Sequence, residues 1–175
     1  EYGIPPFHWV VEFPEVFKRE NGGFDAIVGN PPFLGGRKIS GSYGAEYLSW
    51  LMGNYSESHG NADLVSYFFR RGYDLLRAGG NLGLITTNTI RQGSTRSSAL
   101  APILRSQGRI SRAVRRLRWP GEAAVVVSVV HVDKDYERVA RLDEEPVAEI
   151  SSYLLNSGYN DSPARLEANS KKAFQ

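Results

Sequence analysis

The tetrapeptide Asn30-Pro31-Pro32-Phe33 has the residue types and order to do chemistry. Its two prolines remove two backbone donors and fix φ at about −65°, and the residue before each proline is held in extended geometry. The side-chain oxygen of Asn30 and the carbonyl of Pro31 should therefore form a rigid pair of acceptors, followed by the ring of Phe33. A planar group with an exocyclic NH2 fits this set, because each N–H finds an acceptor and the ring stacks on Phe33.

The chemistry expected at such a site is attack by the amino nitrogen. An aromatic amine is a weak nucleophile, because its lone pair is delocalised into the ring. Acceptors on both N–H bonds favour a pyramidal nitrogen whose lone pair is free, and the proton can leave after the attack without a tuned general base. Rigid placement supplies much of the remaining catalysis. An ordinary Asn-Pro turn is the alternative interpretation of the same residues.

Apolar runs and alternating patterns predict the strands that position this segment. A short strand or an extended packing arm is expected over residues 7–13, and strands are expected over 24–28, 82–86, 110–117 and 123–132. The run 24–28 is expected to be buried and to carry the tetrapeptide at its C-terminal end. The run 123–132 is continuous in Val and Ala, which predicts a strand covered on both faces.

Two helices are expected between these strands. The first runs over 62–77, is capped by Asn61 and buries a stripe that includes Leu64 and Phe68. The second runs over 94–106. Residues 34–61 are rich in Gly and Ser around an amphipathic island at 45–55, and so long a loop is typical of a functional segment.

The order of strands and helices predicts an α/β fold, in which ligands bind beyond the C-terminal ends of the strands. Asn30 lies at such an end. We expect one domain over 1–134 and a polar extension over 135–175.

Composition excludes several classes of protein. With 41% hydrophobic and 23% charged residues, the chain is not a disordered tail, and without cysteine it holds no disulfide scaffold and no Cys-ligated metal. No apolar run approaches the ~20 residues of a membrane span, so no membrane is expected as a partner. No metal is expected either, because His8, His59 and His131 share no metal-ligand spacing. A net charge of +2 is too small to indicate nucleic-acid binding by itself, and the lack of cysteine fits the cytoplasm.

Residues 25–33 resemble the catalytic motif of S-adenosylmethionine-dependent N6-adenine DNA methyltransferases. The segment 7–17 resembles the run-in to this motif in Type IIG-like restriction–modification and phage-defence methyltransferases. Asp63-Leu64 and the segment 80–88 resemble the two motifs that follow. The resemblance covers about residues 5–134.

The resemblance implies a partial Rossmann-like fold, a three-layer α/β/α arrangement whose mixed sheet has a reversed final strand. It implies catalytic roles for Asn30, Pro31, Pro32 and Phe33 on a flipped adenine of double-stranded DNA. It also implies S-adenosyl-L-methionine contacts from Asp63, Leu64 and Asn30.

One departure from the family pattern concerns the cofactor side. The Gly-rich loop that holds the methionine end of the cofactor does not precede Asn30 in this sequence. The chain is therefore expected to be the C-terminal half of a catalytic domain, inactive alone. The missing N-terminal half and a target-recognition domain are expected in the parent protein.

Basic residues near the tetrapeptide are candidates for phosphate contacts. Arg37 and Lys38 follow Phe33 directly, and Arg91 and Arg96 follow the strand 82–86. The arginine-rich stretch 105–118 could be a phosphate-binding patch, but it is interpreted as a solvated edge strand protected by charge. Two alternatives remain open: a methyltransferase acting on an RNA base or a protein glutamine, and a non-catalytic nucleic-acid-binding piece.

Overall fold

The computed structural model describes residues 7–119, 125–135 and 138–161 of the 175-residue chain. The described part contains six strands: β1 (Phe24–Gly29), β2 (Leu76–Thr87), β3 (Gly108–Arg118), β4 (Val126–Lys134), β5 (Ala140–Leu142) and β6 (Glu145–Val147). Its helices are α1 (Trp9–Glu12), α2 (Pro14–Phe17), α3 (Gly36–Tyr43), α4 (Ala45–Asn54), α5 (Val65–Leu75), the 3-10 turn η1 (Asn88–Arg91), α6 (Gly93–Ser98) and α7 (Leu100–Arg105).

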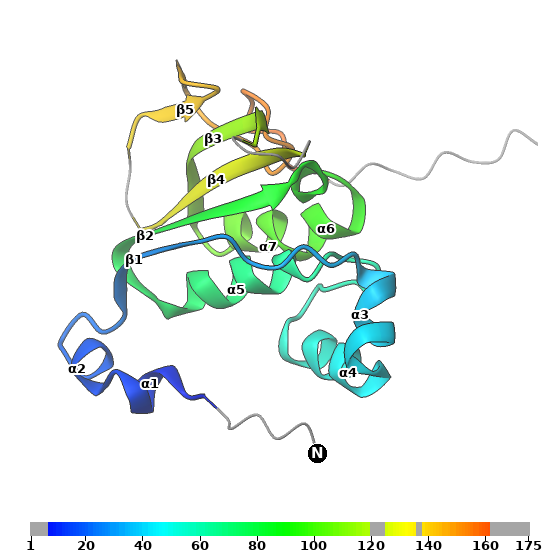
Figure 1. The fold of residues 1–175 in the computed structure, drawn as a ribbon. Helices are drawn as coiled ribbons and strands as arrows, with labels where there is room; N and C mark the ends of the chain where they lie inside the picture. Colours follow the sequence, from blue (N-terminus) through cyan, green and yellow to red (C-terminus); the bar gives the residue numbers. More distant parts are fainter. Residues whose placement is uncertain (1–6, 120–124, 136–137, 162–175) are drawn as a thin grey trace, which may run out of the picture.

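The strands form one mixed sheet in the order β1-β2-β4-β3-β5-β6 (Figure 1). β1 and β2 are parallel, with Ile27 opposite Leu82 and Gly29 opposite Leu84. β4 is antiparallel to both of its neighbours, β2 and β3. The predicted α/β class with a reversed strand is therefore confirmed.

The main core lies between the sheet and the helices α5, α6 and α7, which lie along one face of the sheet in Figure 1. Its fully buried side chains include Phe69 of α5, Leu82 of β2, Leu100 and Ile103 of α7, and Val130 and Val132 of β4. The helical layer that the resemblance implies on the opposite face has no counterpart among the described residues. Within those residues, no helix is long and apolar enough to span a membrane.

The chain continues in the same sheet after residue 134. β5 pairs in parallel with β3, and β6 pairs with β5. Ile150 and Leu154, which follow β6, are 1% and 0% exposed and belong to the main core. The described part of the polar extension is therefore packed against the rest of the domain.

The predicted strand over residues 7–13 is wrong, because this segment forms α1 and leads into α2. The helical turn places Trp9 and Phe13 with their rings stacked at 5.8 Å, and both rings contact Phe24 edge-on. The large residues that alternate in the sequence therefore form an aromatic cluster on helical turns. Such a cluster needs tertiary partners that periodicity does not reveal.

Several other expectations need correction. β1 is an edge strand rather than a buried one, and Val28 is 78% exposed. Phe68 lies 42% exposed on α5 instead of in its buried stripe. The helix expected over 94–106 is broken at Ala99, where φ is −108° and ψ is −85°. In the segment 34–61, the amphipathic island predicted at 45–55 forms α4, whereas the residues before it form α3 instead of the expected loop.

The predicted strand 123–132 corresponds to β4, and residues 120–124 lie outside the described ranges. One face of β4 is buried at Val130 and Val132, and the other is buried at Val127 and Asp133 and half-buried at Val129 and His131. The expectation of cover on both faces is therefore met at the positions of these buried side chains, and one face is less completely covered at its centre.

Candidate active site

The tetrapeptide lies at the carboxyl ends of the two parallel strands. Asn30 directly follows Gly29, the last residue of β1, and Gly29 pairs with Leu84 of β2. β2 leads at the same edge into η1, which begins at Asn88. Ligands of open α/β sheets bind at this edge, so the sequence motif and the topology indicate the same place.

The four residues of the tetrapeptide differ in burial. Pro31 is buried, whereas Asn30 and Pro32 are exposed and Phe33 is 39% exposed. Nothing in the described part of the chain forms a hydrogen bond with the Asn30 side chain. The buried Pro31 thus lies between the free side-chain amide of Asn30 and the accessible ring of Phe33. The proposed recognition of a planar amino group requires such an acceptor and such a ring.

The segment after Phe33 is tied to the start of α5. The Leu34 N–H donates to Oδ1 of Asp63 at 3.2 Å, and the Leu64 N–H donates to the Leu34 carbonyl at 2.8 Å. The same Asp63 oxygen accepts the Val65 N–H at 3.0 Å. The structure therefore brings Asp63 and Leu64 to the C-terminal end of the tetrapeptide.

These contacts change the interpretation of the helix start. Asp63 and Leu64 are only 8% and 4% exposed, and Asp63, not Asn61, satisfies the first free amide of α5. Leu34 and Thr95 take part in this arrangement and were not singled out from the sequence. The hydrogen bond between Leu34 and Asp63 joins residues 29 positions apart, and only the folded structure reveals it.

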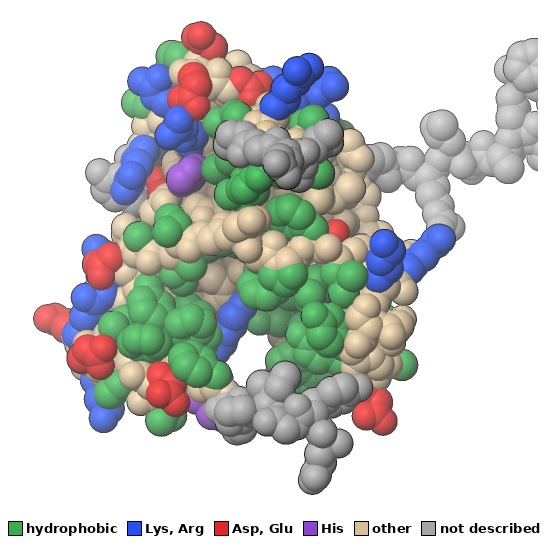
Figure 2. Space-filling model, viewed as in Figure 1, with side chains coloured by type: hydrophobic (Ala, Val, Ile, Leu, Met, Phe, Trp, Pro, Cys, Tyr) green, Lys and Arg blue, Asp and Glu red, His purple; other side chains and the backbone are tan. Residues whose placement is uncertain are grey.

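An apolar cavity borders α5 near the hydrogen bond between Leu34 and Asp63. A cavity of about 190 Å³ lies between α4 and α5. It is lined by Tyr47, Trp50, Leu51, Tyr55, Leu64, Tyr67, Phe68 and Arg71. The rings of Tyr47 and Trp50 stack at 6.0 Å, and Trp50 is 57% exposed. Figure 2 shows hydrophobic side chains gathered in the lower half of the view, on both sides of a hollow.

A second apolar cavity, of about 460 Å³, lies between β1 and α5. Phe68 and Arg71 line both cavities, and Val28 and Leu84 contribute from the sheet. Burial raises the pKa of Tyr55 and of Tyr67 in the first cavity, so both phenols stay protonated at neutral pH. Largely aromatic and aliphatic walls, with the cation of Arg71 at both cavities, suit a planar organic ligand.

The four basic residues named as phosphate candidates occupy different environments. Arg37 and Lys38 are exposed in the first turn of α3, close in sequence to Phe33. Arg91 is half-buried and donates to the Asn88 side-chain oxygen at 3.1 Å. Arg96 is only 3% exposed, so it is unavailable to phosphate in this structure.

Arg96 serves the fold instead. Its guanidinium lies 4.0 Å from the ring centroid of Tyr153 and donates to the Ser152 hydroxyl at 2.8 Å. These contacts hold the segment after β6 against α6. The expectation that Arg96 contacts DNA is therefore corrected.

Two of the five arginines of β3 pair with acids. Arg112 pairs with Glu144 at 2.6 Å and Arg115 pairs with Asp143 at 2.7 Å. Both acids follow β5, which covers the side of β3 that was expected to be a free edge. The interpretation as a charge-protected strand rather than a phosphate patch agrees with these pairs, although the strand is internal.

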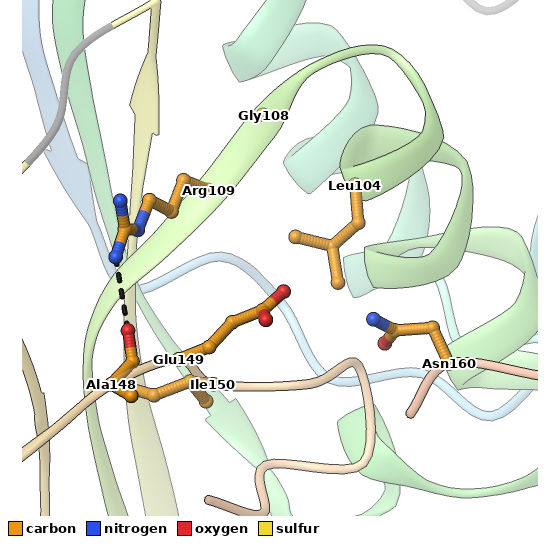
Figure 3. A pocket seen from close by; sticks show the side chains of 7 residues that line it. All are labelled: Leu104, Gly108, Arg109, Ala148, Glu149, Ile150 and Asn160. Carbon is orange, nitrogen blue, oxygen red and sulfur yellow. Dashed lines mark hydrogen bonds between the residues drawn. The ribbon is translucent and has the colours of Figure 1, made fainter. Parts of the chain in front are cut away.

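A third cavity, of about 330 Å³, lies between α7, the start of β3 and the segment after β6 (Figure 3). Arg109 there donates to the Ala148 carbonyl at 3.1 Å, and Asn160 accepts the Ser152 N–H at 2.6 Å. Both side chains thus hold the C-terminal segment in place. Among the described residues, no group of His, Asp or Glu side chains could hold a metal ion.

Comparison with known proteins adds a family to this geometry. The family model described as Eco57I restriction-modification methylase matches residues 1–114. The Type II methyltransferase M.PaeR7I of Pseudomonas aeruginosa is 41% identical over 64 residues, which is 37% of this chain and 10% of that protein.

One similar solved structure is the Type IIL restriction-modification enzyme MmeI in complex with DNA. It aligns with a TM-score of 0.58 and 24% identity over 75% of this chain and 19% of that chain. The likeness to MmeI is one of fold. This chain spans a tenth of the length of M.PaeR7I and about a fifth of the length of MmeI.

Proposed function

The chain belongs to the Eco57I restriction-modification methylase family, and we propose that it carries the amino-acceptor side of an N6-adenine DNA methyltransferase. The observation that carries the proposal is the exposed, unbonded side chain of Asn30 at the carboxyl end of β1. It stands beside a buried Pro31 and an accessible Phe33. This arrangement offers two acceptors and a ring face to a planar amine.

The mechanism places the target amino group between Asn30 and Pro31. The Asn30 side-chain oxygen and the Pro31 carbonyl accept its two N–H bonds, which frees the nitrogen lone pair for attack. Phe33 stacks on the ring and fixes its plane. The surplus proton leaves to solvent after the attack, so no residue of the chain needs to act as a base.

The cofactor proposed is S-adenosyl-L-methionine, which supplies an electrophilic methyl group when bound. The apolar cavity beside Leu64 and Phe68 fits an uncharged planar ring such as the adenine end of that molecule. Asn30 faces solvent at the same end of the fold and is the proposed polar contact. Leu64 contributes through the cavity wall, because its side chain is almost fully buried.

DNA is the proposed substrate, with the target adenine flipped out of the duplex to reach this surface. Arg37 and Lys38 are the proposed phosphate contacts, since both are exposed in α3 just after the tetrapeptide. MmeI was solved in complex with DNA, which supports the same class of partner for this chain.

The activity is proposed for a longer protein of which this chain is one part. The two similar proteins are about four times as long as this chain, because 64 aligned residues make up 10% of M.PaeR7I and 75% of this chain makes up 19% of MmeI. The rest of the cofactor site and the choice of DNA sequence are assigned to segments outside this chain. The cytoplasm is the proposed location, because that is where a restriction–modification enzyme meets its DNA.

The proposal is tested by comparing three acceptors in the full-length protein. Double-stranded DNA, RNA and a glutamine-containing protein are each incubated with S-adenosylmethionine carrying a labelled methyl group, and products are identified by mass spectrometry. We expect label in N6-methyladenine of DNA only. Label in RNA or in glutamine would contradict the DNA assignment, and no label in any acceptor would favour a binding role without catalysis.

A further inference from the structure

The carboxylate of Asp63 points into the protein rather than toward an open site. It is 8% exposed, and its Oδ1 accepts two backbone amides, those of Leu34 at 3.2 Å and Val65 at 3.0 Å. Val65 is the first residue of α5, where a helix leaves its amides without intrahelical partners. One oxygen thus satisfies the start of a helix and the residue after Phe33 together.

The backbone of Leu34 is held on both sides by this contact. Its N–H donates to Asp63, while its carbonyl accepts the Leu64 N–H at 2.8 Å. The tetrapeptide therefore has two fixed ends, β1 before Asn30 and the tied Leu34 after Phe33. A segment held at both ends keeps its acceptors in place without a bound ligand.

Asp63 is itself held from α6. Its N–H donates to the Thr95 hydroxyl at 3.2 Å, and the Ser66 hydroxyl donates to the Thr95 carbonyl at 3.4 Å. Thr95 is 7% exposed, so these bonds are sheltered from water. Sheltered hydrogen bonds cost more to lose than exposed ones, because the freed groups cannot turn to solvent.

We propose that Asp63 is a positioning residue for the methyl transfer, acting through the Leu34 N–H on the segment 30–33 and not by binding the cofactor. The inference rests on the proposed function. Removing the carboxylate frees the Leu34 amide and loosens one end of the tetrapeptide. A displacement of about 1 Å between reacting groups can cost on the order of 100-fold in rate.

The test uses three variants of the full-length protein. Asp63→Ala removes the acceptor, Asp63→Asn keeps an oxygen at the same position, and Asp74→Ala removes an exposed carboxylate from α5 as a matched control. The methyl-transfer rate is measured with DNA and S-adenosylmethionine both saturating, and cofactor affinity is measured separately at equilibrium.

We expect Asp63→Ala to slow the saturated rate by at least about tenfold with cofactor Kd changed by less than about threefold. Asp63→Asn should keep most of the rate, and Asp74→Ala all of it. A weaker cofactor Kd in Asp63→Ala at an unchanged saturated rate would overturn the proposal in favour of a ligand role. So would an Asp63→Asn variant as slow as Asp63→Ala.

Hydrogen exchange supplies a readout that does not need activity. The amide of Leu34 should exchange faster in Asp63→Ala and at the normal rate in Asp63→Asn. An unchanged exchange rate of the Leu34 amide in Asp63→Ala would contradict the positioning role of Asp63 and would leave the proposed function untouched. Absence of methyl transfer by the unaltered protein would instead contradict the proposed function. If Asp63→Ala does not fold, Thr95 provides the same comparison, because its hydroxyl accepts the Asp63 N–H. Thr95→Val removes this acceptor and Thr95→Ser keeps it.

Discussion

Gly36 packs directly on the backbone of Asn61, and a Cβ placed on Gly36 would lie 2.4 Å from the Asn61 carbonyl carbon. The neighbouring Gly35 has nothing within 4 Å of a Cβ in its position. The start of α3 is therefore pressed against the segment that leads into α5, close to the Leu34–Asp63 hydrogen bond. The candidate site depends on this close approach of two chain segments.

The two glycines give a matched pair of variants. Gly36→Ala should push the segment after Phe33 away from Asn61 and destabilise the chain by about 1–3 kcal/mol, the usual cost of overpacking. Gly35→Ala should leave stability within about 0.5 kcal/mol, because its Cβ meets open space. Denaturant unfolding of both variants measures the difference. Equal stability of the two would contradict the packing described for Gly36.

Phe33 should affect methyl transfer more than stability. Phe33 is 39% exposed, so Phe33→Ala loses the contacts of the part that packs on the protein, and a base stacked on the accessible ring would lose a further contact, usually worth about 1–3 kcal/mol. We expect a roughly 5- to 100-fold loss of kcat/KM in a variant that remains folded at the assay temperature. Phe33→Trp, which keeps a ring face, is the control and should retain most of the activity. A Phe33→Ala protein with normal kcat/KM would exclude a stacking role.

Arg37 and Lys38 should contribute to DNA affinity through phosphate charge. Replacing both by Ala should weaken binding of every DNA sequence and lower the slope of log K against log salt by about 0.9 for each lost contact. Arg115→Ala is the control, because Arg115 pairs with Asp143. Titrations of the full-length protein at several salt concentrations provide the slopes. Identical slopes for the Arg37–Lys38 double variant and the unaltered protein would remove these residues from the interface.

Acid should destabilise the fold through His131 of β4. Burial lowers the pKa of His131, the cations of Arg112 and Arg138 act in the same direction, and the carboxylates of Asp133 and Glu144 oppose them. The unfolded chain therefore binds a proton near its ordinary pKa of about 6.5 before the folded chain does, and the free energy of unfolding falls as pH drops below that value.

This pH effect is measured by denaturant unfolding of the chain between about pH 8 and about pH 5.5. We expect the unaltered chain to lose stability over that interval and His131→Gln to lose less. The stability contributed by a neutral His131 is complete above the unfolded pKa. A stability loss in His131→Gln equal to that of the unaltered chain would assign the pH dependence to other groups.

The sequence was most informative where local rules decide the structure. The apolar run before Gly29 and the two prolines after Asn30 predicted a strand with a functional loop at its end, and the structure has β1 there. The helix after Asp63 was also predicted, since its apolar periodicity is strong. These features depend on neighbouring residues alone.

The sequence was least informative where distant partners decide the structure. The aromatic residues 7–13 alternate as a strand would, but they pack on Phe24 as helical turns. Arg96 looked like a phosphate ligand, but Tyr153 and Ser152 enclose it. The role of Asp63 depends on Leu34, and no local pattern connects these two residues.

The measurement that tests the central claim most directly is nucleoside mass spectrometry of DNA treated with the full-length protein and S-adenosylmethionine, with Asn30→Ala compared with the unaltered protein. Asn30 is exposed, so its replacement should leave Tm unchanged. We predict N6-methyladenine with the unaltered protein and none with a folded Asn30→Ala variant. Normal amounts of N6-methyladenine from Asn30→Ala would contradict the claim that this side chain holds the target amino group.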